Sequence, residues 1–181
     1  INAPDYRKNV PDNAFTDMRV RKALLANAFV MLSQGIPFYQ GGSEILRTKQ
    51  GDHNSYKSSD ETNDFDWGDK AEFSEVFDYY KGLIEFRKAH PAFRLTNADS
   101  VKELQDVNRL NNDDSLIFQH LKNKANGDSF EDILVLYNVS GEKKHIKWLP
   151  KNVEWKVVAN HEKIDFNNPI KTVKPDNTTN V

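Results

Sequence analysis

The chain has 181 residues, enough to bury one large hydrophobic core or two small ones. Its 25 basic and 27 acidic side chains nearly cancel, so the composition predicts no surface that binds nucleic acid or an anionic membrane through charge. The absence of cysteine excludes disulfides, thiolate metal sites and cysteine nucleophiles, and the apolar runs are too short to span a bilayer.

Neither end of the sequence has the features of a natural terminus. The chain begins with Ile1 and shows no charged-then-apolar signal pattern, and its last residues resemble the approach to another strand. We therefore expect the chain to be part of a longer protein. Its compartment stays open, with a bacterial protein that is secreted or held at the cell surface preferred to a cytoplasmic one.

Two long helices are predicted in the first half of the chain. The first covers 14–33 and is capped by Asp12 or Asn13. It has two apolar sets that should bury it on more than one side: Phe15, Met18, Leu25, Phe29 and Leu32, and Val20, Leu24, Ala28 and Met31. The second helix covers 70–89 and ends at His90-Pro91, with one face marked by Phe73, Val76, Phe77, Tyr80, Leu83, Ile84 and Arg87.

A short apolar run and a long polar loop separate these helices. Residues 36–40 read Ile-Pro-Phe-Tyr-Gln and predict a brief buried strand, with the proline near its start where a missing N–H is tolerated. Residues 44–68 are rich in Asp, Asn and Ser and predict a loop. A loop of this length in a compact protein is usually functional or disordered, and its aromatic residues argue against disorder.

From about residue 96 the hydrophobic pattern changes to a period of two. Strands are predicted at 100–107, 115–122, 132–139, 143–149, 153–159 and 169–174. The run 132–139 is apolar on both faces, which predicts a central strand. Short antiparallel strands of this kind indicate a β-sandwich, so we place a domain boundary at about 93–99.

The loop at 44–68 is the main candidate for chemistry. It combines carboxylates, amides, a histidine and aromatic rings between a predicted strand and a predicted helix, where barrel enzymes carry their active-site loops. Carboxylates and amides hydrogen-bond sugar hydroxyls, and aromatic rings cover the apolar face of a sugar. From the residues alone, a solvated loop whose Asp and Asn side chains only form turns is an equally good interpretation.

Two motifs carry a resemblance to a known family. Residues 33–44, Ser-Gln-Gly-Ile-Pro-Phe-Tyr-Gln-Gly-Gly-Ser-Glu, resemble the region of the eighth barrel strand in the α-amylase superfamily, with the form Gly-x-Pro, four residues, Gly-x-Glu. Residues 46–56, Leu-Arg-Thr-Lys-Gln-Gly-Asp-His-Asn-Ser-Tyr, and 63–67, Asn-Asp-Phe-Asp-Trp, resemble the loop of type I pullulanases. The match extends over 12–95, and the β-rich remainder agrees with that family in pattern only.

The resemblance implies an α+β fragment of two parts. Residues 1–95 would be the last strand/helix units of a (β/α)8 TIM barrel. Residues 96–181 would be a C-terminal antiparallel β-sandwich domain that lacks its last strand. The function implied is cleavage of α-1,6 links in α-glucans such as pullulan, amylopectin and glycogen, by a retaining mechanism with two carboxylates.

No catalytic residue is assigned to this chain. In the family, the two catalytic carboxylates and a stabilising aspartate lie on barrel strands four, five and seven, and neither an Arg-x-Asp nor a His-Asp motif of that kind occurs here. We therefore expect the chain alone to be inactive and to need the rest of the barrel as its partner. No cofactor or metal is predicted, and calcium in the parent protein stays open.

The resemblance also implies roles for individual loop residues. The substrate-binding candidates are Asn54, Tyr56, Asp60, Asn63, Asp52 and His53. Related amylases have an arginine four residues after the aspartate where this chain has Asp64, so Asn63 is interpreted as its replacement. Glu44 and Arg47 would brace the site from behind, and Trp67 is interpreted as core at the entry of the following helix. The alternative function is a non-catalytic β-sandwich module that binds carbohydrate or stiffens the barrel.

Overall fold

The computed structural model describes residues 10–110, 113–146, 149, 153–175 and 179–180. Its α-helices are α1 (Met18–Leu32), α2 (Asp60–Asn63), α3 (Asp69–Glu72), α4 (Ser74–Ala89) and α5 (Ala98–Leu104). Its strands are β1 (Gln105–Leu110), β2 (Asp113–Leu121), β3 (Ile133–Asn138), β4 (His145–Ile146), β5 (Trp155–Val157), β6 (Lys171–Val173) and β7 (Thr179–Asn180). Residues 147–148, in the predicted strand 143–149, lie outside the described residues.

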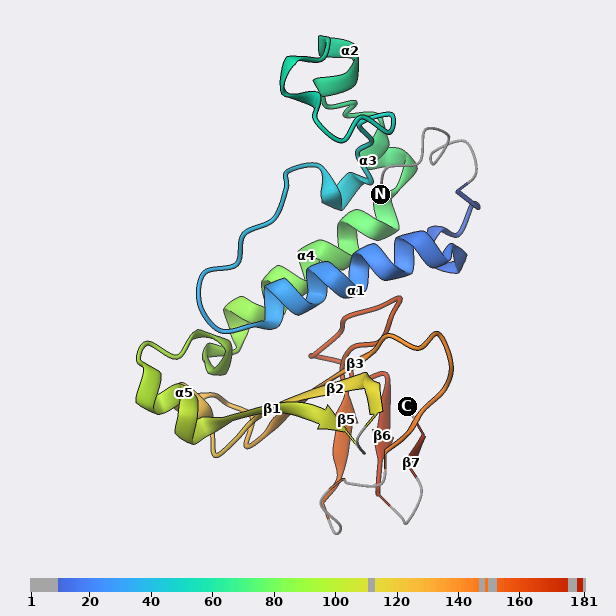
Figure 1. Ribbon diagram of the computed structural model, residues 1–181. Helices are drawn as coiled ribbons and strands as arrows, with labels where there is room; N and C mark the ends of the chain where they lie inside the picture. The colour runs from blue at the N-terminus through green and yellow to red at the C-terminus, as the bar shows by residue number, and fades with distance from the viewer. Residues whose placement is uncertain (1–9, 111–112, 147–148, 150–152, 176–178, 181) are drawn as a thin grey trace.

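Helices α1 and α4 lie side by side and run in the same direction (Figure 1). Near their starts, the backbone N–H of Ala14 donates to the carboxylate of Glu75 at 3.1 Å. At their ends, the guanidinium of Arg87 donates to the carbonyl of Ser33 at 2.7 Å. Residues 33–42 therefore return along the pair, antiparallel to both helices.

The predicted helix 14–33 is interrupted at its beginning. Residues Ala14–Thr16 form a 3₁₀ turn, and α1 begins after Asp17. The carboxylate of Asp17 accepts from the backbone N–H of Arg19 at 2.7 Å and pairs with its guanidinium at 2.6 Å. Asp17 is thus the N-cap of α1, and the predicted cap at Asp12 or Asn13 is wrong; Asn13 instead caps the 3₁₀ turn.

Only one apolar side of α1 is fully buried. The second predicted set, Val20, Leu24, Ala28 and Met31, is buried together with Leu32. From the first predicted set, Met18 is 45% exposed and Phe29 is 41% exposed. Helix α1 is therefore less enclosed than its sequence predicts.

The helix predicted at 70–89 is confirmed, with a break at Phe73. That residue is buried and has a non-helical backbone, which separates α3 from α4. Helix α4 ends at His90 as expected, and the following proline opens a 3₁₀ turn at Pro91–Arg94. Val76, Tyr80, Leu83 and Arg87 of the predicted face are buried in α4, whereas Ile84 is 37% exposed and Phe86, which lies outside that face, is buried.

The buried strand predicted at 36–40 is wrong for this chain. Residues 36–40 form no strand in the described part of the chain, and Ile36 and Phe38 are 95% and 89% exposed. The two residues between and after them, Pro37 and Tyr39, are half-buried, and the Tyr39 ring lies 5.9 Å from the ring of Tyr80. A strand requires hydrogen-bonded neighbours, and none of the described residues provides one here.

The second half of the chain is built from antiparallel strands, as predicted. Strands β1, β2 and β3 form a sheet in that order, while β4 pairs with β7 and β5 with β6. Among the described residues β3 lies at the edge of this sheet, so the prediction that 132–139 is a central strand is wrong for the described part of the chain. The strand predicted at 100–107 is also wrong in its first part, because Asn97 caps α5 by accepting from Ser100 N–H at 2.8 Å.

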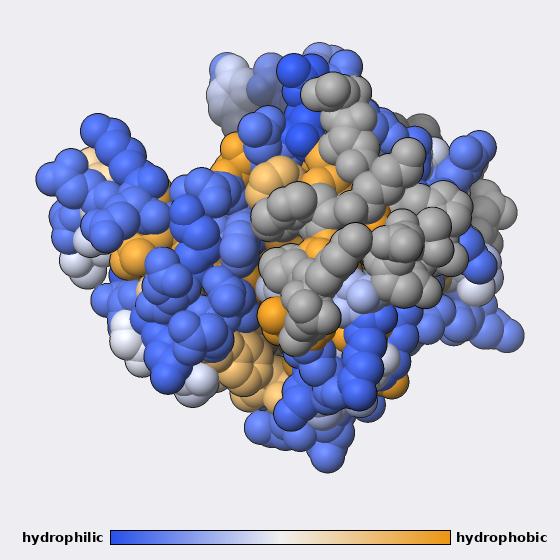
Figure 2. Space-filling model, turned by 90° about the horizontal axis from the view of Figure 1, so that it is seen from below, coloured by the Kyte–Doolittle hydropathy of each residue, from blue (hydrophilic) through white to orange (hydrophobic). Residues whose placement is uncertain are grey.

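A shared core joins the helix pair to the strands. It contains Ala28, Met31, Leu32, Leu83, Phe86, Ala92, Phe93, Leu121, Ala125 and Ile133. The amide of Gln119 on β2 extends this contact by donating to the carbonyl of Leu32 at 3.0 Å. Viewed from below, hydrophilic side chains cover most of the surface, and hydrophobic ones gather at its centre beside the grey atoms (Figure 2).

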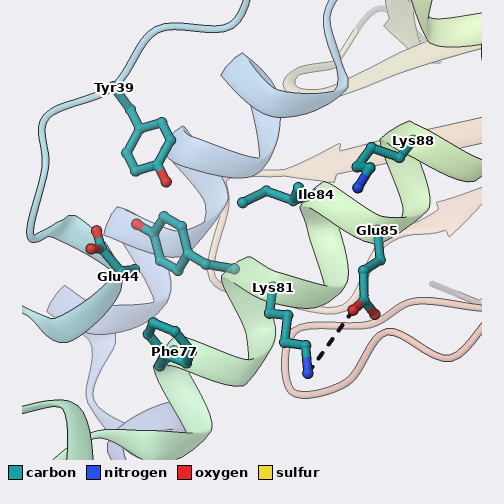
Figure 3. Close-up of a pocket in the computed structure, with 8 residues that line it drawn as sticks. Tyr39, Glu44, Phe77, Lys81, Ile84, Glu85 and Lys88 are labelled. Atoms are coloured by element: carbon teal, nitrogen blue, oxygen red, sulfur yellow. Dashed lines mark ion pairs between the residues drawn. The ribbon is translucent and has the colours of Figure 1, made fainter.

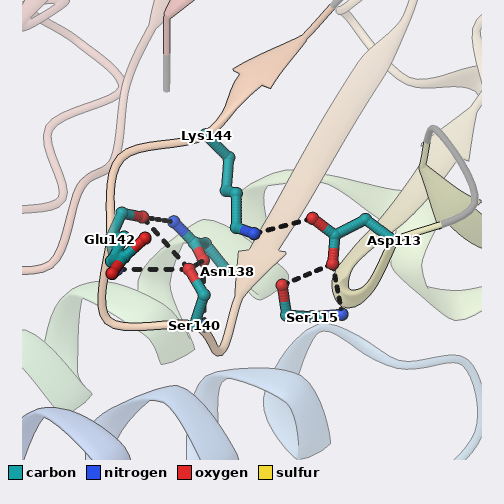
Figure 4. Close-up of polar contacts among 6 residues, drawn as sticks. All are labelled: Asp113, Ser115, Asn138, Ser140, Glu142 and Lys144. Carbon is teal, nitrogen blue, oxygen red and sulfur yellow. Dashed lines mark hydrogen bonds and ion pairs between the residues drawn. The ribbon is translucent and has the colours of Figure 1, made fainter.

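Polar side chains fasten the connection between β3 and β4 to the start of β2 (Figure 4). The Lys144 ammonium pairs with Asp113 Oδ2 at 2.7 Å, and Ser115 donates its backbone N–H to Asp113 Oδ1 at 2.8 Å. Asn138 spans the turn by donating to the carbonyl of Glu142 at 2.6 Å. The Lys144 ammonium, followed by the Ser115 hydroxyl, holds the pKa of Asp113 well below its usual 3.8.

This lowered pKa predicts a pH-dependent contribution to stability. A carboxylate with a depressed folded pKa contributes fully above its unfolded pKa, and the contribution is lost as pH falls through the folded pKa. Lys144→Met removes the largest cause. Thermal unfolding should show the wild type more stable than Lys144→Met at pH 6, with the difference shrinking as pH falls below 3.8. A difference that persists unchanged to pH 2 would contradict this assignment.

Candidate functional site

The loop at 44–68 extends away from the sheets, with α2 at its far end (Figure 1). The prediction of a loop is confirmed, although the loop contains helical turns at Ser55–Lys57 and in α2. Its two ends meet next to the Gly41-Gly42 turn, where the chain leaves the return segment. The loop is therefore a folded unit with a base and a tip.

Arg47 ties the base of the loop together. Its backbone N–H donates to the carbonyl of Gly42 at 2.8 Å, and its Nε donates to the carbonyl of Asp64 at 2.8 Å. Its guanidinium also donates to the carbonyl of Asn63 and lies 3.9 Å from the ring centroid of Phe65. Arg47 thus connects the two ends of the loop, through its backbone at Gly42 and through its side chain at residues 63–65.

Glycine is required at position 42 for two reasons. Its φ of +92° lies in the left-handed region that side chains disfavour. A Cβ there would lie 2.6 Å from Cδ of Arg47, too close for a real contact. The Gly-x-Glu motif therefore keeps the turn open for the Arg47 side chain.

Two predicted substrate residues are bound to the loop itself. The amide of Asn63 donates to the carbonyls of Ser55 and Ser58 at 2.8 and 3.0 Å and accepts from Lys49 Nζ at 2.6 Å. Asp52 accepts from the backbone N–H of Asn54 at 2.8 Å and from the Ser58 hydroxyl. The Ser58 hydroxyl, followed by that N–H, lowers the pKa of Asp52. These bonds stabilise the tip, and direct contact of Asp52 or Asn63 with a sugar stays a prediction.

The remaining predicted substrate residues are exposed at the tip. His53, Asn54 and Asp60 are exposed, and Tyr56 is 74% exposed. Asn54 and Tyr56 flank the start of one helical turn, and Asp60 begins α2. The bonds of Asn63 fix that turn against α2, so the loop gathers these residues in one lobe, where they present polar groups and a ring to solvent.

Glu44 lies apart from this lobe, in a cavity beside α4 (Figure 3). Its carboxylate accepts from the backbone N–H of Gly42 at 3.0 Å. The cavity has a volume of 320 Å³ and is lined by Tyr39, Glu44, Phe77, Tyr80, Lys81, Ile84, Glu85 and Lys88. Burial, followed by the Glu44 carboxylate, raises the pKa of Tyr39. Of the predicted site residues, Glu44 alone is among those lining this cavity.

The sequence analysis missed this cavity. Its signal was the stripe of alternating apolar and charged residues along α4, from Phe77 to Lys88. The sequence pattern predicts Ile84 on the buried face, because hydrophobic periodicity alone does not show how wide the covered stripe of a helix is.

The interpretation of Trp67 as core is wrong. Its side chain is 68% exposed and stacks on the ring of Phe65, with centroids 5.6 Å apart and an interplanar angle of 17°. The helix that follows is entered instead through Asp69 and Phe73, which are both buried. The acidic residue at the start of α3 therefore occupies the place predicted for the tryptophan.

Within the described ranges, His, Asp and Glu side chains form no group of three or more that could hold a metal ion. The same ranges contain no helix with the length and apolarity needed to cross a membrane.

Comparison with known proteins gives the family. Residues 105–163 match the model of the family described as pullulanase, all-beta domain. The pullulanase of Bacillus subtilis is 39% identical over 133 residues, which are 74% of this chain and 17% of that protein. The chain belongs to the pullulanase family. The resemblance predicted from the motifs is therefore confirmed.

Solved pullulanase structures share the fold of this chain. The pullulanase from Bacillus acidopullulyticus is 39% identical with a TM-score of 0.81, covering 90% of this chain and 19% of that one. The pullulanase from Anoxybacillus in complex with maltotetraose is 31% identical with a TM-score of 0.77, covering 91% and 22%. This pullulanase-family chain thus spans about a fifth of the length of its relatives.

Proposed function

We propose that this chain supplies the last strand/helix units of a (β/α)8 barrel, and the β domain after it, to a longer debranching glycoside hydrolase. The reaction proposed for that protein is cleavage of α-1,6 links in glucans such as pullulan. Its domains would be 1–95 and 96–181, with the shared core between them. The pullulanase relatives support the proposed reaction, and the share of their length that this chain spans supports a longer parent protein.

The alternating exposure of residues 36–40 carries the barrel part of the proposal. Tyr39 packs against the helices, whereas Ile36 and Phe38 on the opposite side are almost fully exposed. This is the pattern of a strand with one face covered by helices and the other bare. In a closed barrel the bare face fills the interior and both edges pair with neighbouring strands.

The direction of the chain supports the same interpretation. Consecutive helices of a (β/α) barrel are parallel, and the strand between them runs the opposite way. Helices α1 and α4, with the return segment 33–42, have this arrangement (Figure 1). The loop at 44–68 then leaves the carboxyl end of the strand position, where such barrels place their active sites.

The loop would bind and orient the glucan without taking part in bond cleavage. A retaining glycosidase uses one carboxylate as nucleophile and another as acid/base, and we place both outside this chain. Asn54 and Asp60 would hydrogen-bond sugar hydroxyls, and Tyr56 would cover an apolar sugar face. A solved relative carries maltotetraose, which supports an α-glucan as the ligand. The chain alone is then expected to be inactive.

Single substitutions at the loop tip test this proposal in the complete protein. Asn54→Ala and Asp60→Ala should each lower kcat/KM on pullulan, by roughly ten- to a hundredfold for the charged Asp60. Both side chains are exposed, so thermal unfolding should stay unchanged. Asp78→Ala, at an exposed position of α4, is the control and should retain wild-type kinetics. Wild-type kinetics in both loop variants would contradict the proposed role.

A supporting role for the β domain is favoured by the shared core. Phe93 and Leu83 pack with Leu121 and Ile133 from the strands, so the sheet covers the ends of the helix pair. We therefore prefer a domain that stiffens the barrel to one that binds carbohydrate independently.

A further inference from the structure

Three side chains form a layered stack at the base of the loop. The Arg47 guanidinium lies 3.9 Å from the ring centroid of Phe65, and Trp67 stacks on that ring at 5.6 Å with an interplanar angle of 17°. Phe65 is 37% exposed, whereas Trp67 is 68% exposed. The stack therefore ends in an aromatic surface that faces solvent.

The backbone holds this stack in place. A Cβ at Gly41 would lie 3.5 Å from Cζ of Phe65, and one at Gly42 would lie 3.1 Å from its Cε1, so the phenyl ring rests on the glycine turn. After Trp67, the Asp66 carboxylate accepts from the backbone N–H of Gly68 at 2.9 Å and fixes the turn. A ring that is already ordered loses little conformational entropy when a ligand binds to it.

The surroundings of Trp67 fit a sugar better than a protein. Asp64, Asp66, Lys70 and Glu72, which lie within five residues of Trp67 in the sequence, are all exposed. The core of a protein interface is depleted of charged residues, whereas a ligand site combines aromatic surface with a few polar groups. A glucose unit presents an apolar ring face bordered by hydroxyls, which suits an exposed indole with exposed carboxylates at nearby positions of the chain.

We propose that Trp67 is a stacking platform for one glucose unit of the α-glucan, an inference that rests on the proposed function and extends it. The platform is held by Phe65 and Arg47 and lies at the base of the loop that carries Asn54 and Asp60. Its role is to position substrate, since the cleavage chemistry lies elsewhere.

Kinetics of the complete protein on pullulan test the platform. Trp67→Ala should raise KM about three- to tenfold, the range that a single aromatic stack provides, while kcat stays within about twofold. Trp67→Phe retains a ring and should recover most of the loss. Val139→Ala, at an exposed apolar position on the strand side, should leave both constants unchanged.

The outcomes separate this inference from the proposed function. If the wild type hydrolyses pullulan and Trp67→Ala has the same KM, the platform is refuted and the proposed function stands. If the wild type hydrolyses no α-1,6 link, the proposed function is refuted, and calorimetry with maltotetraose then tests the platform alone. If Trp67→Ala lowers the melting temperature with KM unchanged, the indole is covered by protein and the inference is overturned.

Discussion

Replacing Asp128 by Ala should destabilise the complete protein by about 3–5 kcal/mol. The carboxylate lies 2.8 Å from Nδ1 of His90, and the two side chains are 1% and 2% exposed. It also accepts from the backbone N–H groups of Ala92 and Phe130 at 3.2 and 2.9 Å. Removing it leaves the N–H groups of Ala92 and Phe130 and the buried imidazole without their acceptor, and aromatic rings contact that imidazole.

This buried pair joins the end of α4 to the turn that precedes β3, so its loss should loosen the contact between helices and strands. Limited proteolysis should show faster cleavage within 91–97 in Asp128→Ala, together with a lower midpoint of chemical unfolding. The matched control is Asp132→Ala, which removes a His–Asp contact of 3.0 Å to His120 at a carboxylate that is 36% exposed. The free energy of unfolding of Asp132→Ala should fall by about 1 kcal/mol or less. An equal fall in Asp128→Ala and Asp132→Ala would contradict the role given to the buried pair.

Replacing Arg87 by Met should lower the free energy of unfolding of the complete protein by about 3 kcal/mol or more. The guanidinium is buried and donates to the carbonyls of Met31, Ser33 and Gly35 at 2.8, 2.7 and 2.6 Å. Met31 is in the last turn of α1, and Ser33 and Gly35 follow its end, where helical carbonyls lack partners. A hydrogen bond to a charged group is worth about 1.5–3 kcal/mol, and the bonds to one guanidinium are not additive.

Two further substitutions make this result specific. Arg87→Lys keeps the charge but loses the planar fork, so we expect an intermediate loss of stability. Lys88→Met changes the neighbouring exposed position and should stay within about 0.5 kcal/mol of wild type. Chemical unfolding of the complete protein measures all three. If Arg87→Met unfolds at the same midpoint as Lys88→Met, the guanidinium does not hold the end of α1.

The sequence predicted those elements whose pattern and packing agree within this chain. The sequence predicts the end of helix α4 and most of its buried face, because Val76, Tyr80 and Leu83 meet apolar partners on α1 and on the strands. Strands β2 and β3 were found because both have neighbours in register. Residues 36–40 were not placed correctly, because their apolar pattern is that of a strand whose neighbours are not among the described residues.

A helix cap explains why α5 forms at 98–104, where the sequence pattern predicts a strand from residue 100. The segment Ala-Asp-Ser-Val-Lys-Glu-Leu carries no strong period of either kind, and the strand predicted at 100–107 therefore begins before β1 does, at Gln105. The side chain of Asn97 decides the outcome by capping a helix. An Asn followed by acidic residues was a signal that could have been read as a helix start.

The candidate loop was found from its motif, whereas its internal geometry was not. Spacing alone does not show that Asn63 and Asp52 are engaged by the loop backbone and by Ser58. It also does not show that Trp67 faces solvent, because a tryptophan near a helix start is buried in many proteins. The stack with Phe65 depends on the return of the chain beside Gly42, which only a three-dimensional structure reveals.

A crystal structure of the complete protein with bound maltotetraose tests the central claim most directly. We expect the oligosaccharide in a cleft that the lobe borders, with Asn54 or Asp60 hydrogen-bonded to its hydroxyls and Tyr56 or Trp67 against a sugar ring. An oligosaccharide that occupies the cleft while all four side chains contact only water or other parts of the protein would contradict it.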